Sequence, residues 1–254
     1  MAAVTALECA SQKFLYSRNI VKTPHPRSTR PPTVTGGAPI RTFQLRQGRI
    51  SNRHSGAMAR WWTVYGLPEN ETFEQESVFG RRAPLVLEIG SGMGDATIEM
   101  AAADPERDYV AVEVHTPGIA NLLHLIADHE LSNVRVFNGD ALEFVRTLPE
   151  DSLTAVHAFF PDPWPKTRHH KRRLIQTGHV AILGSRLMPG GVLHCATDWA
   201  AYAESMLEVL SADTNLINAF EGYAPRPEHR PVTKFEQRGI DAGREIFDLV
   251  FRHI

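Results

Sequence analysis

From Pro84 onward, short apolar runs alternate with helical stretches, and this alternation limits the folds that the chain can adopt. The runs "PLVLEIG", "DYVAVEVH", "NVRVFNGD", "SLTAVHAFFPD" and "GVLHCATD" predict buried strands. The segments between them predict helices, including one from about Lys171 to "MPGG", and "REIFDLVFRHI" predicts a closing strand. Strands that alternate with helices pair in parallel. We therefore expect an α/β fold, a doubly wound and mostly parallel sheet with helices on both faces.

Residues 1–40 differ in composition from the rest of the chain. They are rich in Pro, Ser, Thr and Gly, so we predict a flexible basic extension there and a folded domain over residues 41–254. Residues 1–53 carry nine Lys or Arg and one acid, whereas residues 54–254 carry eighteen Lys or Arg and twenty-eight acids. A basic arm on an acidic body suggests a polyanionic partner. A solvated tail and an organelle transit peptide are the alternatives.

The remaining composition argues against several classes of protein. No apolar run approaches the roughly 20 residues that a membrane-spanning helix needs, so we expect no membrane partner. Cys9 and Cys195 lie far apart, which fits a reducing compartment, and we predict a cytoplasmic location. The twelve histidines show no recognised ligand spacing, so we predict no metal site.

Acidic residues end three successive predicted strands, and ligands of doubly wound sheets bind beyond such strand ends. Glu88 lies in the first of these strands, just before Gly90 and Gly92, which let the backbone approach a ligand. Glu113 ends the second strand, where a carboxylate can accept hydrogen bonds from ribose hydroxyls. Asp140 ends the third, where it can accept from an adenine amino group. Together they predict a nucleoside-shaped pocket.

The glycine spacing separates two kinds of nucleoside cofactor. The loop has the spacing GxGxG, and Asp95 occupies the place where a nicotinamide-binding loop favours glycine. Combined with the acids at the next two strand ends, this spacing favours S-adenosylmethionine. The alternative is a structural role, in which Glu88 caps a helix and Glu113 is simply solvated.

The stretch "FFPDPWPKTRHHKRR" follows the fourth strand and sets one acid before a run of cations. Pro161 and Pro163 stiffen the backbone around Asp162 and so fix the direction of its side chain. The rings of Phe159, Phe160 and Trp164 offer surfaces on which a base can stack. Cations are unfavourable at a helix N-terminus, so we infer that the cations of this run face phosphates instead. We therefore expect a base to enter beside Asp162 while its backbone lies along the cations.

The motifs "LEIGSGMG", "VEVH", "GDA", "FFPDPWPKTRHHKRR", "ATDW" and "VTKFEQRGIDAGREIFDLVF" together resemble those of the bacterial tRNA (guanine-N7-)-methyltransferase family. The resemblance runs from about Arg41 to the C-terminus. It implies a seven-stranded sheet of the S-adenosylmethionine-dependent methyltransferase type, with S-adenosylmethionine as cofactor and tRNA as partner. The implied product is 7-methylguanosine in the tRNA variable loop.

The resemblance also implies roles for individual residues. Asp162 would be the catalytic acid and would border the cofactor. The other cofactor-binding residues would be Glu88, Gly90, Gly92, Glu113 and Asp140. The substrate would be contacted by Lys166, Asp198, Thr233, Lys234, Phe235 and Glu236. The RNA-contacting residues would be Arg168, His169, His170, Lys171, Arg172 and Arg173.

The chemistry of this reaction suits a lone acid at Asp162. Guanine N7 carries a free lone pair, so the protein has to align the base and stabilise the cation that forms, and needs no strong base. One alternative is methylation of another nitrogen of RNA or DNA, which nucleoside analysis would distinguish. A second is a non-catalytic RNA-binding protein on the same fold, which a titration with S-adenosylmethionine would distinguish.

Overall fold

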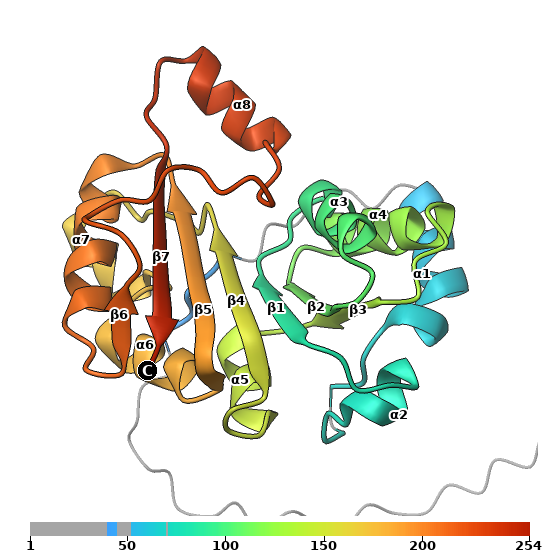
Figure 1. The fold of residues 1–254 in the computed structure, drawn as a ribbon. Coiled ribbons are helices and arrows are strands. Elements are labelled where there is room, and N and C mark those ends of the chain that lie inside the picture. Colours follow the sequence, from blue (N-terminus) through green and yellow to red (C-terminus); the bar gives the residue numbers. More distant parts are fainter. Residues whose placement is uncertain (1–39, 45–51, 70) are drawn as a thin grey trace, which may run out of the picture. The chain divides into compact units, whose positions relative to one another are not determined.

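The structure is a computed structural model that describes residues 40–44, 52–69 and 71–254. The predicted basic extension lies outside the described residues, apart from Ile40. Seven strands of the described part form one sheet in the order β3-β2-β1-β4-β5-β7-β6 (Figure 1). They are β1 (Leu85–Ile89), β2 (Asp108–Glu113), β3 (Val134–Asn138), β4 (Leu153–Phe159), β5 (Leu187–Thr197), β6 (Leu216–Asn218) and β7 (Phe247–His253).

The sheet is mostly parallel, as the alternation of apolar runs predicted. Strands β1 to β5 all pair in parallel, and β7 is inserted antiparallel between β5 and β6. The carboxyl ends of β1 to β5 therefore meet at one edge of the sheet. This is the edge at which doubly wound folds bind their ligands.

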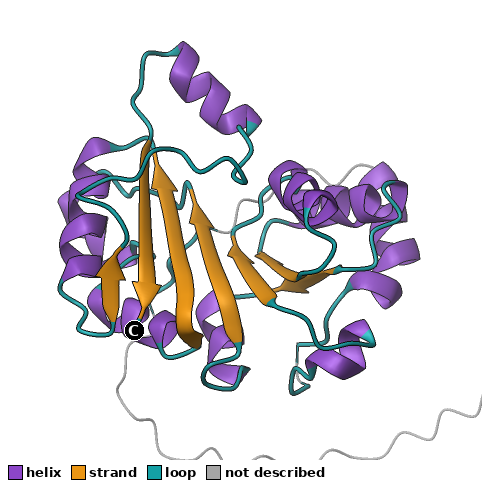
Figure 2. Ribbon diagram, viewed as in Figure 1, coloured by secondary structure: helices purple, strands orange, loops and turns teal. Residues whose placement is uncertain are grey.

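Helices cover both faces of the sheet (Figure 2). One buried cluster joins the sheet to α1 (Asn52–Tyr65), α3 (Asp95–Ala103) and α4 (Thr116–Asp128). The other cluster joins it to α5 (Ala141–Thr147), α6 (Thr177–Gly184) and α7 (Ala200–Ser211). Two further helices are α2 (Gln75–Phe79) and α8 (Lys234–Asp241). The apolar side chains on one face of α4, Ile119, Leu122, Leu123 and Ile126, are fully buried.

One predicted helix is wrong in its bounds. The sequence suggested a helix from about Lys171, whereas the structure has a 3₁₀ helix, η1 (Thr167–Arg172), and a separate α6. The chain between them is extended, with φ −145° and ψ 154° at Gln176. The Gln176 amide donates to the Lys171 carbonyl over 3.0 Å, so a side chain takes the place of a helical hydrogen bond there.

None of the helices in the described ranges has the length and apolar content needed to cross a membrane.

Candidate active site at the carboxyl ends of the strands

A cavity of about 270 Å³ lies at the carboxyl ends of β1, β2 and β4. Four residues singled out in the sequence line it: Gly90, Gly92, Glu113 and Asp162. The rest of the wall includes Phe159, Phe160 and the segment 42–44. The strand-end acids and the acid between the prolines thus share one cavity, although some seventy residues separate Gly90 from Asp162 in the sequence.

The Glu113 carboxylate fixes the floor of this cavity. Its Oε2 accepts a hydrogen bond from the Gly92 amide over 2.7 Å, and its Oε1 accepts from the amides of Val114 and His115 over 2.7 and 2.8 Å. Gly92 has φ 58°, in the left-handed region that favours glycine. A carboxylate offers about four acceptor sites, so Glu113 keeps capacity for a ligand while it holds the loop.

Glu88 lies beneath the cavity and does not line it. Its side chain is buried and accepts a hydrogen bond from the Thr97 hydroxyl of α3 over 2.5 Å. Burial raises the pKa of the Glu88 carboxyl from 4.5 to about 7, an effect that the Thr97 hydrogen bond opposes. The structure thus ties Glu88 to α3, behind the glycine loop.

Asp140 lies at the border of a second cavity. Its Oδ1 accepts from the Leu142 amide over 2.9 Å, which makes Asp140 the N-cap of α5. Its neighbours Gly139 and Ala141 line the first cavity, whereas Asp140 itself lines the second. Gly139 belongs to both walls, so the two cavities adjoin at this turn.

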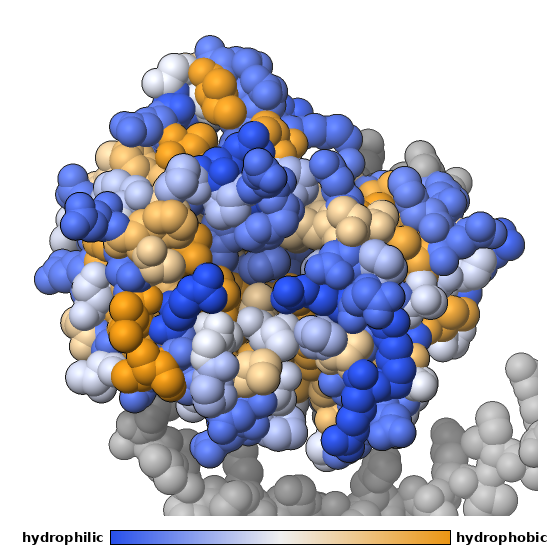
Figure 3. Space-filling view, viewed as in Figure 1, coloured by the Kyte–Doolittle hydropathy of each residue, from blue (hydrophilic) through white to orange (hydrophobic). Residues whose placement is uncertain are grey.

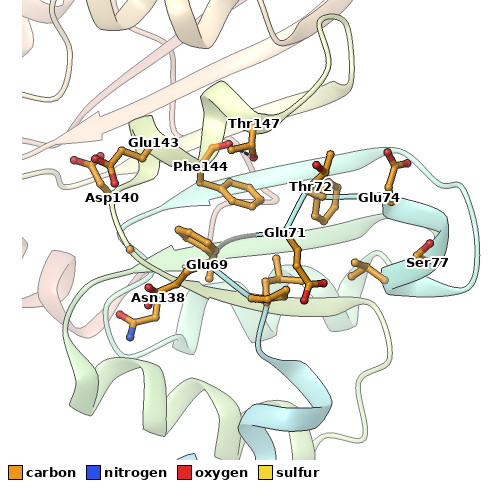
Figure 4. Close-up of a pocket in the computed structure, with 16 residues that line it drawn as sticks. Glu69, Glu71, Thr72, Glu74, Ser77, Asn138, Asp140, Glu143, Phe144 and Thr147 are labelled. Carbon is orange, nitrogen blue, oxygen red and sulfur yellow. Dashed lines mark hydrogen bonds between the residues drawn. The ribbon is translucent and has the colours of Figure 1, made fainter. Parts of the chain in front are cut away.

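The second cavity is larger, about 500 Å³, and the sequence arguments missed it. Figure 4 shows Asp140 and Glu143 at one end of it and Glu74 and Ser77 at the other. Apolar side chains of β3 and α5, Phe137 and Phe144, form part of its wall. The acids of "PENETFEQES" were the available signal, but nothing in their spacing shows that three of them line a cavity together with residues of α5.

Asp162 stands where the first cavity meets a shallow hollow of about 290 Å³. The hollow is also lined by Trp164, Lys166 and His169, so it leads from the cavity toward the cation run. Phe160 and Trp164, on either side of the Pro-Asp-Pro segment, have φ of 51° and 45°. Bulky residues rarely adopt the left-handed region, which means that local strain accompanies the orientation of Asp162.

The aromatic rings around Asp162 differ from the sequence expectation. Trp164 is buried: its Nε1 donates to the Thr42 carbonyl over 3.3 Å, and the Arg172 guanidinium lies 5.0 Å from its ring centroid. Phe159 is also buried, between His157 and His194. Trp164 is therefore not an open surface for stacking. Phe160 is half-buried and lines the cavity.

The cation run divides into an exposed part and a buried part. Lys166, Arg168 and Lys171 are exposed, and His169, His170 and Arg172 are half-buried. Partial desolvation lowers the pKa of His169, and the neighbouring cations, Arg168 first, lower it further.

Arg173 lies inside the protein, contrary to the expectation that the whole run faces RNA. Its Nε donates to the Pro163 carbonyl over 3.0 Å, and its guanidinium lies 4.7 Å from the centroid of the Tyr202 ring. This hydrogen bond connects Pro163, the residue after Asp162, to the segment that leads into α6. Arg173 is therefore placed to hold the Pro-Asp-Pro segment.

The predicted substrate-binding residues of the C-terminal segment also divide. Thr233 caps α8, and its Oγ1 accepts from the Glu236 amide over 3.0 Å. Lys234 and Phe235 are exposed, and the Phe235 ring lies 5.5 Å from that of Phe160. In Figure 3 the region at the top of the view, where α8 lies, is mostly hydrophilic with separate hydrophobic patches, and Phe235 and Ile240 of this helix are exposed. Asp198 pairs with Arg244 over 2.9 Å.

Arg230, which the sequence arguments missed, joins α8 to the sheet. Its guanidinium donates to both carboxylate oxygens of Glu236 over 2.6 and 2.9 Å, and to both oxygens of Asp248 in β7 over 2.7 and 2.8 Å. All three side chains are at most 2% exposed. Glu236 is therefore engaged inside the protein and does not present its carboxylate to solvent.

The sequence matches known methyltransferases. A family model described as "Putative methyltransferase" matches residues 82–249. A tRNA (guanine-N(7)-)-methyltransferase of Nitrosospira multiformis is 53% identical over 216 residues, which are 84% of this chain and 94% of that protein. A protein of the same name from Paraburkholderia xenovorans is 54% identical over 84% of this chain and 83% of that protein.

Solved structures of methyltransferases share the fold. The 16S rRNA methyltransferase KamB superposes with a TM-score of 0.55 at 15% identity, over 74% of this chain and 98% of that one. An antibiotic-related methyltransferase superposes with a TM-score of 0.52, also at 15% identity, over 74% of this chain and 96% of that one. At this identity the likeness shows the fold alone.

Proposed function

The chain belongs to the tRNA (guanine-N7-)-methyltransferase family, and we propose that it methylates N7 of a guanine in the variable loop of tRNA. It is a methyltransferase that uses S-adenosylmethionine, which supplies an electrophilic methyl group when bound. The observation that carries the substrate proposal is the position of Asp162, at the junction of the strand-end cavity and the hollow that leads to the cations.

The residues of the two adjoining cavities fit S-adenosylmethionine. The Gly92 loop brings backbone close to the cavity, and Glu113 is held with acceptor capacity for ribose hydroxyls. Because Gly139 belongs to both walls, an elongated ligand can extend from the Asp162 side toward Asp140. We propose that Glu88 acts from behind, by holding α3 and the glycine loop.

Asp162 would act by position and charge. Guanine N7 has a lone pair that needs no deprotonation, so the requirement is alignment with the donated methyl group. Methylation leaves the base positively charged, and a fixed carboxylate stabilises that charge more in the transition state than in the ground state. The prolines and the hydrogen bond from Arg173 support the backbone that carries this carboxylate.

The tRNA backbone would follow the exposed cations. Lys166 lines the hollow at Asp162, Arg168 and Lys171 are exposed further along the run, and all three can neutralise phosphates. Phe235, whose ring lies 5.5 Å from that of Phe160, and its neighbour Lys234 would contact the substrate from α8. Residues 1–40, with their excess of Lys and Arg, would add electrostatic attraction as an accessory arm. A tRNA substrate also supports a cytoplasmic location, which we propose for this chain.

Nucleoside analysis of unmodified tRNA after incubation with the protein and labelled S-adenosylmethionine tests the proposed function. We expect 7-methylguanosine as the labelled product. Label in another nucleoside would contradict the N7 assignment, and no label would contradict tRNA as the substrate.

Single-turnover methylation tests the role of Asp162. Asp162→Asn keeps the size of the side chain and removes its charge, so the rate should fall by roughly 10²–10³-fold while tRNA affinity is maintained. Asp151→Asn is a matched control, because Asp151 is exposed in the turn before β4. Equal rates for the two variants would show that Asp162 has only a structural role.

A further inference from the structure

Three histidines from separate segments converge beside the sheet, and none of them lines either of the two cavities. His157 lies on β4, His194 lies opposite it on β5, and His229 lies in the loop between β6 and α8. In Figure 1 this loop crosses the upper part of β7 and β5. The ring centroids are 5.7 to 6.1 Å apart. One ring nitrogen from each residue lies within 4.8 Å of the other two.

These distances are near those of a metal centre. A tetrahedral ion bound to imidazole at about 2.0–2.1 Å holds its ligand nitrogens about 3.3 Å apart. Closing the trio to that spacing requires movements of at most about 1.5 Å. His157 and His194 are only 5% and 1% exposed, whereas His229 is exposed. Rotation of the His229 side chain can therefore close the group from the solvent side.

Two of the nitrogens are buried without a partner. Nδ1 of His157 and Nδ1 of His194 make no hydrogen bond, although neither is in contact with solvent. The other nitrogen of His194, Nε2, lies 2.7 Å from Asp248 Oδ1. An ionised carboxylate only accepts hydrogen bonds, so we assign the proton of His194 to Nε2. The lone pair of Nδ1 is then available to bind a metal ion. A carboxylate behind a histidine in this way is the usual support of a metal ligand.

The charges behind the trio also favour a cation. Arg230 carries one positive charge, and its partners Asp248 and Glu236 carry one negative charge each. The buried group therefore has a net charge of −1, and imidazoles add none when neutral. This excess negative charge attracts a cation, and a divalent ion would leave the group with a net charge of +1.

We propose that His157, His194 and His229 form a binding site for one divalent transition ion of the Zn²⁺ type. Three imidazole nitrogens suit Zn²⁺, Ni²⁺ or Cu²⁺ and disfavour Mg²⁺ and Ca²⁺, which prefer oxygen ligands. Because His229 is exposed, a fourth ligand such as water could reach the ion from the solvent. The ion would fasten the loop that carries His229 and Arg230 to β4 and β5, and so hold the loop that leads to α8. This site is independent of the proposed methyl transfer.

Zinc titration of the full chain, without an affinity tag and stripped with a chelator, tests the site. Calorimetry should show one Zn²⁺ bound per chain. His229→Gln should weaken that binding by more than 10-fold. Loss of a residue that only supports a metal ligand already weakens affinity by about 10-fold or more, and loss of a ligand itself should cost more. His129→Gln is the matched control, since His129 is also an exposed histidine, at the end of α4. It should bind Zn²⁺ as the wild type does.

Two further readouts do not depend on the buried histidines, whose replacement can disturb folding. Zn²⁺ should raise the melting temperature of the wild type and of His129→Gln, and leave that of His229→Gln unchanged. Co²⁺ in place of Zn²⁺ should give a visible spectrum of nitrogen ligation without a thiolate charge-transfer band. Absence of Zn²⁺ binding by the wild type, unchanged binding by His229→Gln, or a thiolate band would each overturn the proposal.

Discussion

Replacement of Arg230 tests how strongly α8 depends on one buried guanidinium. Arg230→Met keeps an unbranched chain of similar length and removes all four hydrogen bonds to Glu236 and Asp248. Both carboxylates would then be buried without their charged partner. Removal of one member of a buried ion pair costs about 3–5 kcal/mol, and two acids are stranded here. The loss is a large share of the roughly 5–15 kcal/mol that stabilises a typical domain.

The effect should depend on pH in a defined direction. Burial raises the pKa of Asp248, but hydrogen bonds from His194 and Arg230 outweigh it and keep that pKa below its ordinary value. The wild type therefore gains stability from Asp248 at neutral pH and loses it as the pH falls through the lowered pKa. Without Arg230 the buried carboxyl favours its neutral form. The difference between wild type and Arg230→Met should therefore shrink as the pH is lowered from 7 toward 4.

Urea denaturation followed by circular dichroism measures the free energy of unfolding at each pH. The matched control is Arg82→Met, because Arg82 forms an ion pair with Glu76 that is 80% and 68% exposed at its two side chains. Exposed pairs contribute about 0–1 kcal/mol. A loss below about 1 kcal/mol for Arg230→Met, equal to that of Arg82→Met, would refute the reasoning that the buried group anchors α8.

Three further outcomes are expected. Gly118→Ala should weaken binding of S-adenosylmethionine in calorimetry, because a Cβ at Gly118 would overlap the Gly92 carbonyl oxygen and displace the glycine loop. Unchanged affinity would show that the loop is not part of the site. The raised pKa of Glu88 favours the protonated carboxyl in the folded state, so the wild type should lose stability as the pH rises from about 4.5 through 7, and Glu88→Gln should abolish this loss. Urea denaturation at pH 5 and 8 measures the effect, and the same pH dependence of stability in wild type and variant would contradict it. Replacing the exposed cations Arg168 and Lys171 with alanine should reduce the slope of log tRNA affinity against log salt by about two units, whereas Arg82→Ala should leave the slope unchanged. The wild-type slope in the double variant would place both cations away from the phosphates.

The strands and their order along the chain were predictable because their signal is local. A run such as "PLVLEIG" is apolar throughout, and all five residues of β1 are buried as a parallel strand requires. Glu113 and Asp162 could be placed at one edge because parallel strands end together. The sequence motifs also indicated the family that the comparisons show.

The rest of the site depends on contacts between distant segments, which no local pattern encodes. Arg173 belongs to a run of cations and is nevertheless buried against Tyr202, about thirty residues further along the chain. Glu236 matched a substrate-binding motif but is engaged by Arg230. The three histidines come from two strands and a loop, so their convergence follows from strand pairing and has no signature in their spacing.

The left-handed backbone at Phe160 places stability and turnover in opposition. Replacing this half-buried residue with glycine would relieve strain of about 1–3 kcal/mol, but it would also loosen the support of the acid between the prolines. Selection for thermal stability alone would therefore tend to accept relaxed backbones here and discard catalytic rate in the process. In laboratory evolution of this enzyme, the segment around Asp162 is a region to hold fixed while gains in stability are sought elsewhere.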